Sequence, residues 1–414
     1  MMARIAIAAI GSRGDVAPFT DFGCRLKEAG HEVVVAAVTE YADSVSECGL
    51  EARSVEFAVS GDIDLEANPM KIAKQAVSPK GMLATGRNLL AALDDVRADV
   101  LLLSPFAELA GHPLAEARNI PSIGVRLQPM STTAEFPPSL MGGWSAGSMI
   151  NRAAGRRAAG VIDRMYGKTI AAFREQLDLP RMSAKAMRRQ RTDAEWPILH
   201  GFSPSVVPRP ADWRPGLEVT GYWWPQQPIG WEPPHDLVSF LESGLPPVIF
   251  GLGSLIVTAD EAARISEIAS EALRKVGVRG VVQAGGAALD AGNDNQIITV
   301  GGVPHDWLFG KAAAVVHSCG AGTMAAGLRA GLPAVAVPSP GGDQLFWSRR
   351  LAELGVSSAT VQRPKLTADK LAAAIDSALT EQSHRDSAEQ LAARIAAEAG
   401  AGAVVDAVER LVRV

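Results

Sequence analysis

Residues 312–337 have the sequence AAAVVHSCGAGTMAAGLRAGLPAVAV, and this stretch decides the fold class. The apolar run that ends at His317 predicts a buried strand, the segment after Gly320 has the apolar spacing of a helix, and 334–337 predicts a second strand. Strand, helix and strand at this spacing form a βαβ unit with parallel strands. Parallel strands need helices on both faces, so we expect a doubly wound α/β domain here.

The same alternation appears on both sides of this stretch. Earlier strands are predicted at 4–10, 33–38, 100–103, 122–125, 248–252, 278–283 and 297–300. Later helices are predicted at 344–354, 368–379 and 387–412, with no further strand signal. Pro and Trp concentrate between Ser203 and Pro247, which is poor material for regular structure. We therefore expect a first domain over 1–207, a linker over 208–245, a second domain over 246–390, and a C-terminal helix over 391–414 near or across the domain interface.

Composition excludes several classes of protein. The chain has 414 residues, of which 47% are hydrophobic and 21% charged, close to globular averages, so disorder and coiled-coil rods are unexpected. A net charge of -5 argues against a general nucleic-acid binder. Three separated cysteines form neither a disulfide framework nor a metal cluster, which fits the cytoplasm. No apolar run reaches the 18 or so residues of a spanning helix, so a membrane role would be peripheral, at the inner face of the membrane.

The turn after His317 has the chemistry of a phosphate site. Gly320 and Gly322 allow a ligand to approach the backbone as a helix begins, and the free N–H groups of that helix attract an anion, with the Thr323 hydroxyl as a further donor. Asp343-Gln344 opens the next helix one strand later and suits the hydroxyl groups of a sugar. Two alternatives remain: a plain strand-to-helix connection, and an NAD site of an oxidoreductase.

Three ordered motifs make the sequence similar to a known family. They are Gly11-Ser-Arg-Gly-Asp-Val16, Val303-Pro-His-Asp-Trp-Leu-Phe309, and the block from His317 to Gln344. With them the chain resembles family 1 glycosyltransferases of the two-Rossmann-domain type, nearest to sterol 3-beta-glucosyltransferases and to antibiotic and glycolipid glycosyltransferases. The resemblance runs over nearly the whole chain. It implies a GT-B-like α/β fold, with two facing Rossmann-like doubly wound parallel-sheet domains and an interdomain cleft.

The resemblance also implies an activity. The implied reaction transfers a hexose from a UDP- or TDP-sugar to a hydroxyl of a lipophilic acceptor, with inversion and without a metal ion or cofactor. The implied acceptors are a sterol or triterpenoid, a glycolipid or a polyketide-type natural product. The first domain would hold the acceptor and the second the donor. Val303 would meet the base through its backbone, and Asp343 and Gln344 would hold the sugar. The other donor-binding positions would be Ser12, Arg13, Gly14, Ser254, His317, Ser318, Gly320, Ala321, Gly322 and Thr323.

Asp15 matches the acidic position regarded as the general base in these relatives. An acceptor hydroxyl that attacks the anomeric carbon must lose its proton, and a nearby carboxylate can accept it. An exposed Asp, with a pKa near 3.9, is a weak base, so partial burial would be needed to raise that pKa. The same residue could instead only begin the first helix.

Two positions depart from the family pattern. Close relatives often carry a His doublet where this chain has His317-Ser318, so a neutral hydroxyl replaces a group that can carry positive charge, and weaker donor binding is predicted. Cys319 replaces Gly, and we interpret it as a packing residue. Because of the first departure, a third hypothesis for the function stays open: a non-catalytic accessory or binding protein on the same fold.

Residues 151–191 hold eleven basic and three acidic side chains in an acidic protein. This charge indicates either a solvated helix face or docking to an anionic membrane. The aromatic residues of the linker, Trp213, Tyr222, Trp223, Trp224 and Trp231, indicate either interdomain packing or a flat apolar acceptor.

Overall fold

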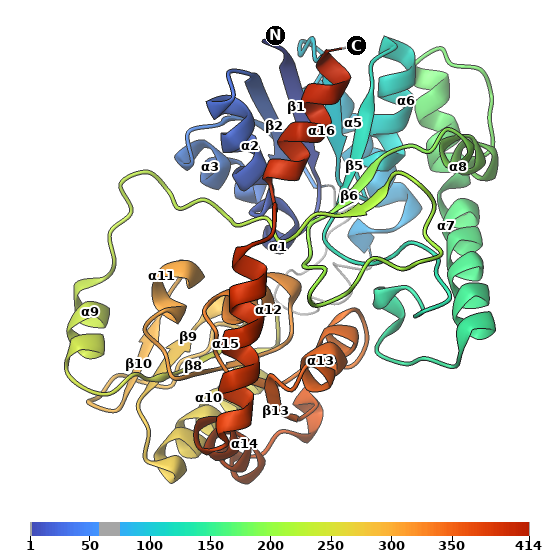
Figure 1. Cartoon of the computed structure of the whole chain (residues 1–414). Helices are drawn as coiled ribbons and strands as arrows, with labels where there is room; N and C mark the ends of the chain where they lie inside the picture. Colours follow the sequence, from blue (N-terminus) through green and yellow to red (C-terminus); the bar gives the residue numbers. More distant parts are fainter. Residues whose placement is uncertain (1, 58–74, 414) are drawn as a thin grey trace.

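The protein is described by a computed structural model that covers residues 2–57 and 75–413. Two parallel sheets form the centres of two α/β domains, which confirms the predicted fold class (Figure 1). The first sheet has the spatial order β3 (Glu51–Val55), β2 (Glu32–Val38), β1 (Arg4–Ala9), β4 (Val100–Leu103), β5 (Ser122–Arg126), β6 (Ile198–His200) and β7 (Leu217–Val219). The second has the order β10 (Ile297–Val300), β9 (Gly280–Gln283), β8 (Val248–Gly251), β11 (Ala314–His317), β12 (Ala334–Ala336) and β13 (Ser357–Thr360).

Helices cover both faces of each sheet. In the first half of the chain they are α1 (Arg13–Val16), α2 (Phe19–Glu28), α3 (Thr39–Glu47), α5 (Pro79–Ala92), α6 (Glu108–Arg118), α7 (Ser148–Gln176) and α8 (Ala184–Asp193), with a 3-10 turn η1 (Ser139–Met141). In the second half they are α9 (His235–Glu242), α10 (Ala259–Val276), α11 (His305–Phe309), α12 (Ala321–Arg329), α13 (Gln344–Glu353), α14 (Ala368–Thr380), α15 (Gln382–Ala396) and α16 (Gly402–Val412), with turns η2 (Gly285–Ala287) and η3 (Arg363–Lys365).

The apolar run of β1 is uninterrupted because both faces of the strand are covered. Ile5 and Ile7 face a core shared with α2 and α16, whereas Ala6 and Ala8 face a core shared with α5 and α6. All four side chains are fully buried. A strand that is covered on both faces cannot alternate apolar and polar residues, so its sequence is a continuous apolar run.

Local signals set the ends of the helices. Thr258 precedes α10, and its hydroxyl accepts a hydrogen bond from the Glu261 N–H at 3.4 Å, while Gly277 ends the helix at φ +75°. These are the polar N-cap and the left-handed glycine that favour a helix start and stop. The helix therefore begins and ends where these local signals lie.

Three expectations about the fold are corrected. A strand does follow residue 344: β13 pairs with β12 at the edge of the second sheet, and its short polar sequence gave no signal. The single helix predicted over 387–412 is two helices, α15 and α16, separated by a bend at Gly400 (φ +54°). The segment 208–245 contains β7, which pairs with β6, so part of it belongs to the first sheet.

The last two helices span both domains. Helix α15 packs against α12 of the second domain, whereas α16 packs against α2 of the first (Figure 1). At the bend between them the Gly400 N–H donates to the Thr220 carbonyl at 2.7 Å. The chain therefore crosses between the domains at two adjacent places.

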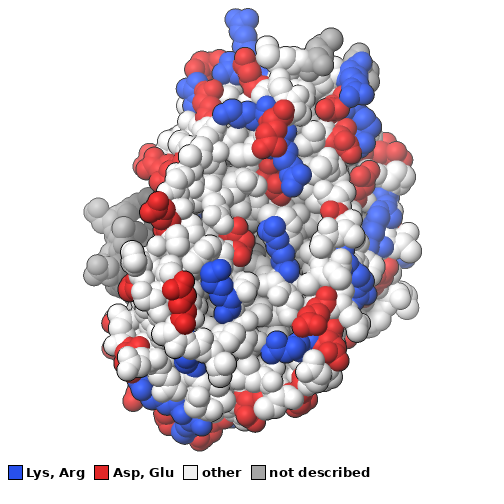
Figure 2. Space-filling model, turned by 60° about the vertical axis from the view of Figure 1, so that its left-hand side comes forward, with Lys and Arg blue, Asp and Glu red and all other residues white. Residues whose placement is uncertain are grey.

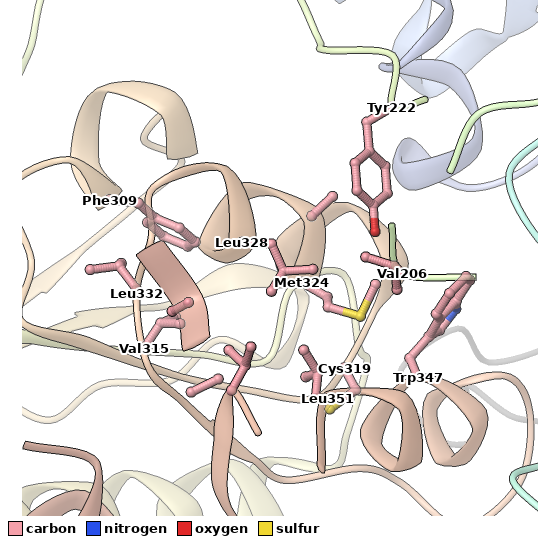
Figure 3. Close-up of a cluster of buried hydrophobic side chains, with 14 of the residues drawn as sticks. Val206, Tyr222, Phe309, Val315, Cys319, Met324, Leu328, Leu332, Trp347 and Leu351 are labelled. Carbon is pink, nitrogen blue, oxygen red and sulfur yellow. The ribbon is translucent and has the colours of Figure 1, made fainter. Parts of the chain in front are cut away.

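A continuous apolar core joins the two halves. Val206 and Tyr222 belong to the same buried cluster as Met324, Trp347 and Leu351 of the second domain. Figure 3 shows the Tyr222 ring extending into this cluster next to Val206. Trp213 lies in the same cluster, while Trp223 is buried in the core with α2 and α16. The linker aromatic residues named here are therefore packing residues.

Within residues 2–57 and 75–413, no helix combines the length and the apolar composition needed to cross a lipid bilayer.

Candidate active site between the two sheets

The predicted site residues lie in turns at the carboxyl ends of the strands. In both sheets the strand order reverses beside the first strand, between β1 and β4 and between β8 and β11. Ligands of doubly wound sheets bind outside the strands at such a point. The Asp15 turn follows β1, and the Ser254 and Ser318 turns follow β8 and β11.

Asp15 is held by the turn in which it lies. The Ser12 N–H and the Ser12 hydroxyl both donate to Asp15 Oδ2 at 2.8 Å. Gly11 makes this geometry possible, because a Cβ at this position (φ +153°) would lie 2.6 Å from Asp15 Oδ2. Burial raises the pKa of Asp15, and hydrogen bonds from Ser12 and from the Gln128 side chain oppose that rise only in part. The carboxyl group is therefore a stronger base than an exposed Asp.

One residue of the turn before α12 has a left-handed backbone conformation. Cys319, not a glycine, has the left-handed backbone conformation, with φ +62°. Gly320 precedes the helix at φ -62°, and a Cβ at Gly322 would meet nothing within 4 Å. The glycines are therefore not needed for backbone conformation, and they leave open space above the first turn of α12, where Ala321 and Thr323 also lie.

The two residues before Cys319 are already engaged within the protein. His317 Nδ1 accepts a hydrogen bond from the Cys319 N–H at 3.0 Å, and burial lowers the pKa of His317 to about 4, with His305 acting in the same direction. His317 is therefore neutral at pH 7. The Ser318 hydroxyl donates to the Leu252 carbonyl at 3.1 Å.

The loop after β8 lies against the start of α12. Gly253 has φ +64°, and a Cβ placed on it would be 3.5 Å from Thr323 Oγ1. Ser254 follows it and is exposed. These residues bring two side-chain hydroxyls, on Ser254 and Thr323, to the same part of the second domain, where a helix N-terminus also offers N–H donors.

Asp343 and Gln344 start α13 and are both half-buried. Asp343 Oδ2 accepts a hydrogen bond from Trp347 Nε1 at 3.0 Å, one helical turn later. Gln344 Oε1 accepts from the Ser339 N–H at 2.8 Å. The two side chains are thus oriented by the protein before any ligand binds.

Charges show that the two domains meet at this place. Burial raises the pKa of Asp343, and the negative charge of Asp15, in the other domain, raises it further. Burial lowers the pKa of His305 to about 4, and the positive charge of Arg13 adds to this effect. A Cβ on Gly302 would be 3.8 Å from Arg13 Nη1. The turn holding Ser12, Arg13, Gly14 and Asp15 therefore faces the second domain.

Val303 lies beside this group and is buried. Its carbonyl oxygen is 3.5 Å from Gln283 Nε2, at the limit of a hydrogen bond. Gln283 ends β9, and its Oε1 would lie 3.0 Å from a Cβ on Gly251. The predicted donor-site residues of the second domain thus come from turns that follow strands of one sheet, whereas Ser12, Arg13 and Gly14 follow β1 of the other sheet.

Sequence reasoning missed Gln128, Trp347 and Gln283. Gln128 follows β5 by two residues, so the rule that ligands bind at the carboxyl ends of strands could have indicated it. Trp347 is four residues after Asp343 on the same helix, a spacing that places two side chains together. Across the described ranges, no group of three or more His, Cys, Asp or Glu side chains is arranged to hold a metal ion.

Two other histidines are packed within the first domain, away from this site. His112 packs edge-on against Trp196 and lies 3.8 Å from Glu108 Oε2. His200 Nδ1 hydrogen bonds to the Glu218 carbonyl at 2.9 Å. Both are buried, with their pKa values lowered by desolvation to about 4 and about 3.

The sequence has similar proteins of known name. Residues 286–411 match the model of the Erythromycin biosynthesis protein CIII-like, C-terminal domain. The O-mycaminosyltylonolide 6-deoxyallosyltransferase of Streptomyces fradiae is 31% identical over 96% of this chain and 94% of its own length. The sterol 3-beta-glucosyltransferase UGT80A2 of Arabidopsis thaliana is 32% identical over 97% of this chain, which spans 64% of the length of that enzyme.

Solved structures share the fold. The glycotransferase of kitacinnamycin superposes with a TM-score of 0.72 at 20% identity, covering 99% of each chain. The glycosyltransferase VinC, solved in complex with DTDP, superposes with a TM-score of 0.66 at 20% identity, covering 99% of this chain and 98% of its own.

Proposed function

Because the chain belongs to the family of glycosyltransferases that includes the sterol 3-beta-glucosyltransferases and the antibiotic glycosyltransferases, we propose that it transfers a hexose from a UDP- or TDP-sugar to a hydroxyl of a lipophilic acceptor. The acceptor is a sterol or triterpenoid, a glycolipid or a polyketide-type natural product. One observation carries this proposal: the turn of the first domain that holds Asp15 faces the loops of the second domain, where a Cβ on Gly302 would lie 3.8 Å from Arg13 Nη1. The raised pKa of Asp343, to which the charge of Asp15 contributes, agrees with this arrangement.

The second domain is proposed to hold the nucleotide diphosphate sugar. The free N–H groups at the start of α12 and the Thr323 hydroxyl would bind the distal phosphate. The Ser254 hydroxyl, in the turn after β8, would also contact phosphate. Val303 would meet the base through its backbone. Asp343 and Gln344 would accept and donate hydrogen bonds to the sugar hydroxyls, and their bonds to Trp347 and Ser339 keep them in position.

Asp15 is proposed as the general base. The acceptor hydroxyl loses its proton to the Asp15 carboxylate as its oxygen forms a bond to the anomeric carbon. The bond from that carbon to the phosphate oxygen breaks, its electron pair leaves with the nucleoside diphosphate, and the configuration inverts. Donors at the start of α12 stabilise the negative charge that develops on the phosphate, without a metal ion. The raised pKa of Asp15 suits this role.

A thermal-shift panel with UDP, TDP, UDP-glucose, TDP-glucose and NAD tests the proposal. A ligand that binds only the folded state stabilises it by about 2.7 kcal/mol at a hundredfold excess over Kd, which moves the midpoint by several degrees. A shift with a nucleoside diphosphate, followed by sugar transfer to cholesterol or another sterol, is the expected result. A shift with NAD alone would contradict it. If no nucleotide shifts the thermal midpoint at millimolar concentration, the result would favour a non-catalytic accessory protein.

A further inference from the structure

Exposed apolar side chains concentrate in one part of the first domain. Of the twelve large apolar side chains that are exposed in the described residues, eight lie between residues 140 and 165. They are Leu140, Met141, Trp144, Met149, Ile150, Val161, Ile162 and Met165. Met149 is 88% exposed. Scattered exposed apolar residues need no explanation, but this group, with five members on α7 and three in the stretch before it, indicates a binding surface.

Part of this group shares the outer side of α7 with basic residues. Tyr166, Ile170 and Phe173 are buried on the inner side of the helix. At 3.6 residues per turn, Ile150, Val161 and Met165 fall on the opposite side. The exposed basic residues Arg157, Arg164 and Lys168 fall beside them. Figure 1 shows α7 along the outer edge of the domain, with α8 beside part of its length.

The basic side chains of this surface are available for an external anion. Within the described ranges no acidic side chain lies within 4.0 Å of Arg156, Arg157, Arg164 or Lys168, whereas Arg152 pairs with Asp212 at 2.8 Å. On the face shown in Figure 2, by contrast, basic and acidic residues are interspersed. The positive surplus is therefore local to α7 and α8, in a chain with a net charge of -5.

A groove between α7 and α8 continues the basic surface. It has a volume of about 650 Å³ and is lined by Arg156, Arg164, Lys185 and Arg188, among others. Its one acidic lining residue, Asp163, is paired with Arg188 at 2.7 Å. The groove has room and charge for a phosphate group.

We propose that this surface, the outer side of α7 with the preceding turn 139–147 and the α7–α8 groove, docks on an anionic lipid bilayer. The apolar side chains enter the boundary between headgroups and acyl chains, while the basic side chains contact lipid phosphates, as in interfacial helices. The same charge disfavours a second copy of the chain as the occupant, because two basic faces repel each other.

The docking surface adjoins the proposed active site. Arg349 of α13 donates to the Gly143 carbonyl at 2.7 Å, and the Phe136 ring packs against Phe346 at 5.4 Å. Helix α13 begins directly after Asp343. An apolar acceptor could therefore pass from the bilayer to the site along the turn 139–147. This consequence rests on the proposed function, but docking itself does not.

Vesicle sedimentation tests the docking surface. Wild-type protein is expected to bind vesicles of phosphatidylcholine with 30% phosphatidylglycerol far better than pure phosphatidylcholine. The triple variant Arg157→Gln, Arg164→Gln, Lys168→Gln should bind the anionic vesicles about a hundredfold more weakly, because each basic residue near the surface contributes roughly a factor of five. The matched control Lys365→Gln, Lys370→Gln, Arg394→Gln removes three exposed charges from the second domain and should stay within twofold of wild type.

The apolar contribution needs its own variant. Ile150→Ser with Met165→Ser should weaken binding at least tenfold while keeping the charge. All of these side chains are exposed, so the thermal midpoint and the shift with nucleotide should match the wild type. Equal binding of wild type to both kinds of vesicle, no binding to either, or equal losses in the test and control triples would each overturn the proposal. A failure of nucleotide binding in wild type would instead count against the proposed function.

Discussion

Replacing Asp15 by Asn tests the proposed chemistry most directly. Both Ser12 hydrogen bonds fall on Oδ2 of Asp15, and the Gln128 side chain also hydrogen bonds to this carboxyl group. Asn has almost the same shape and can keep an oxygen in the Oδ2 position, but it cannot take up a proton at pH 7. The turn should therefore persist while the base is lost.

The expected loss follows from the role of the group. General base catalysis contributes about 10² to 10⁴ in rate, which corresponds to about 2.7 to 5.4 kcal/mol of activation free energy. Stability should not fall. The pKa of Asp15 is raised in the folded protein, so its ionised form opposes folding at pH 7, and the neutral Asn removes that cost. The thermal midpoint should be equal to that of wild type or higher.

Three measurements separate the possible outcomes: the transfer rate with saturating donor and acceptor, the Kd for the free nucleoside diphosphate, and the thermal midpoint. Asp343→Asn is the matched control, because it should raise KM for the sugar donor and leave the Kd for the free nucleotide unchanged. The wild-type rate should also fall as the pH drops through the raised pKa of Asp15. Full transfer activity in Asp15→Asn would refute the assignment, and a lost nucleotide affinity would show that Asp15 acts in donor binding instead.

Four further predictions follow from the geometry. Gly11→Ala places a Cβ within 2.6 Å of Asp15 Oδ2 and should lower the transfer rate as strongly as Asp15→Asn; a normal rate would contradict the described turn. Ser318→His should tighten the nucleotide Kd in calorimetry, because a charge-assisted hydrogen bond is roughly twice as strong as a neutral one; an unchanged Kd counts against this. Cys319→Val should reduce the free energy of unfolding by about 2 kcal/mol or more, because a β-branched residue does not tolerate φ +62°, whereas Cys319→Gly should stay within about 1 kcal/mol in urea titrations. The free energy of unfolding should be at its full value above pH 6.5 and fall toward pH 4, by about 1.4 kcal/mol per pH unit for each histidine whose folded pKa lies below its unfolded value; a constant urea midpoint over this range would exclude that linkage. These histidines are His112, His200, His305 and His317.

Much of the fold could be predicted because the decisive signals are local. The apolar runs of β1 and β11, the cap residues of α10 and the glycine-rich turn before α12 each depend on a few neighbouring residues. β3, β7 and β13 were missed because an edge strand that is short and partly polar has no apolar run. β6 was missed because it has only three residues. The break between α15 and α16 was missed because the apolar spacing resumes after Gly400.

For the candidate site, the resemblance indicated Asp15, Asp343 and Gln344, whose roles stay predictions. Which side chains and backbone groups hold them is known only from the structure: Ser12 and Gln128 for Asp15, Trp347 for Asp343, and Ser339 for Gln344. That the charges of Asp15 and Asp343 interact depends on how two domains pack, and no pattern along the chain contains this information. Cys319 was interpreted as a packing residue, and its buried side chain does pack in the interdomain core, but its left-handed backbone conformation could not be read from the sequence.

Helix α16 has a consequence for how the protein is made. It supplies Val404, Ala407 and Val408 to the core around Phe19 and Phe22, although more than half the sequence separates these residues. At roughly 5 to 20 residues per second, the ribosome finishes residues 402–412 on the order of 10 to 40 s after β7. During that interval the first sheet exists with one face incompletely covered. The first domain is therefore completed only after the second has been synthesised, and its core stays accessible to other chains until α16 emerges.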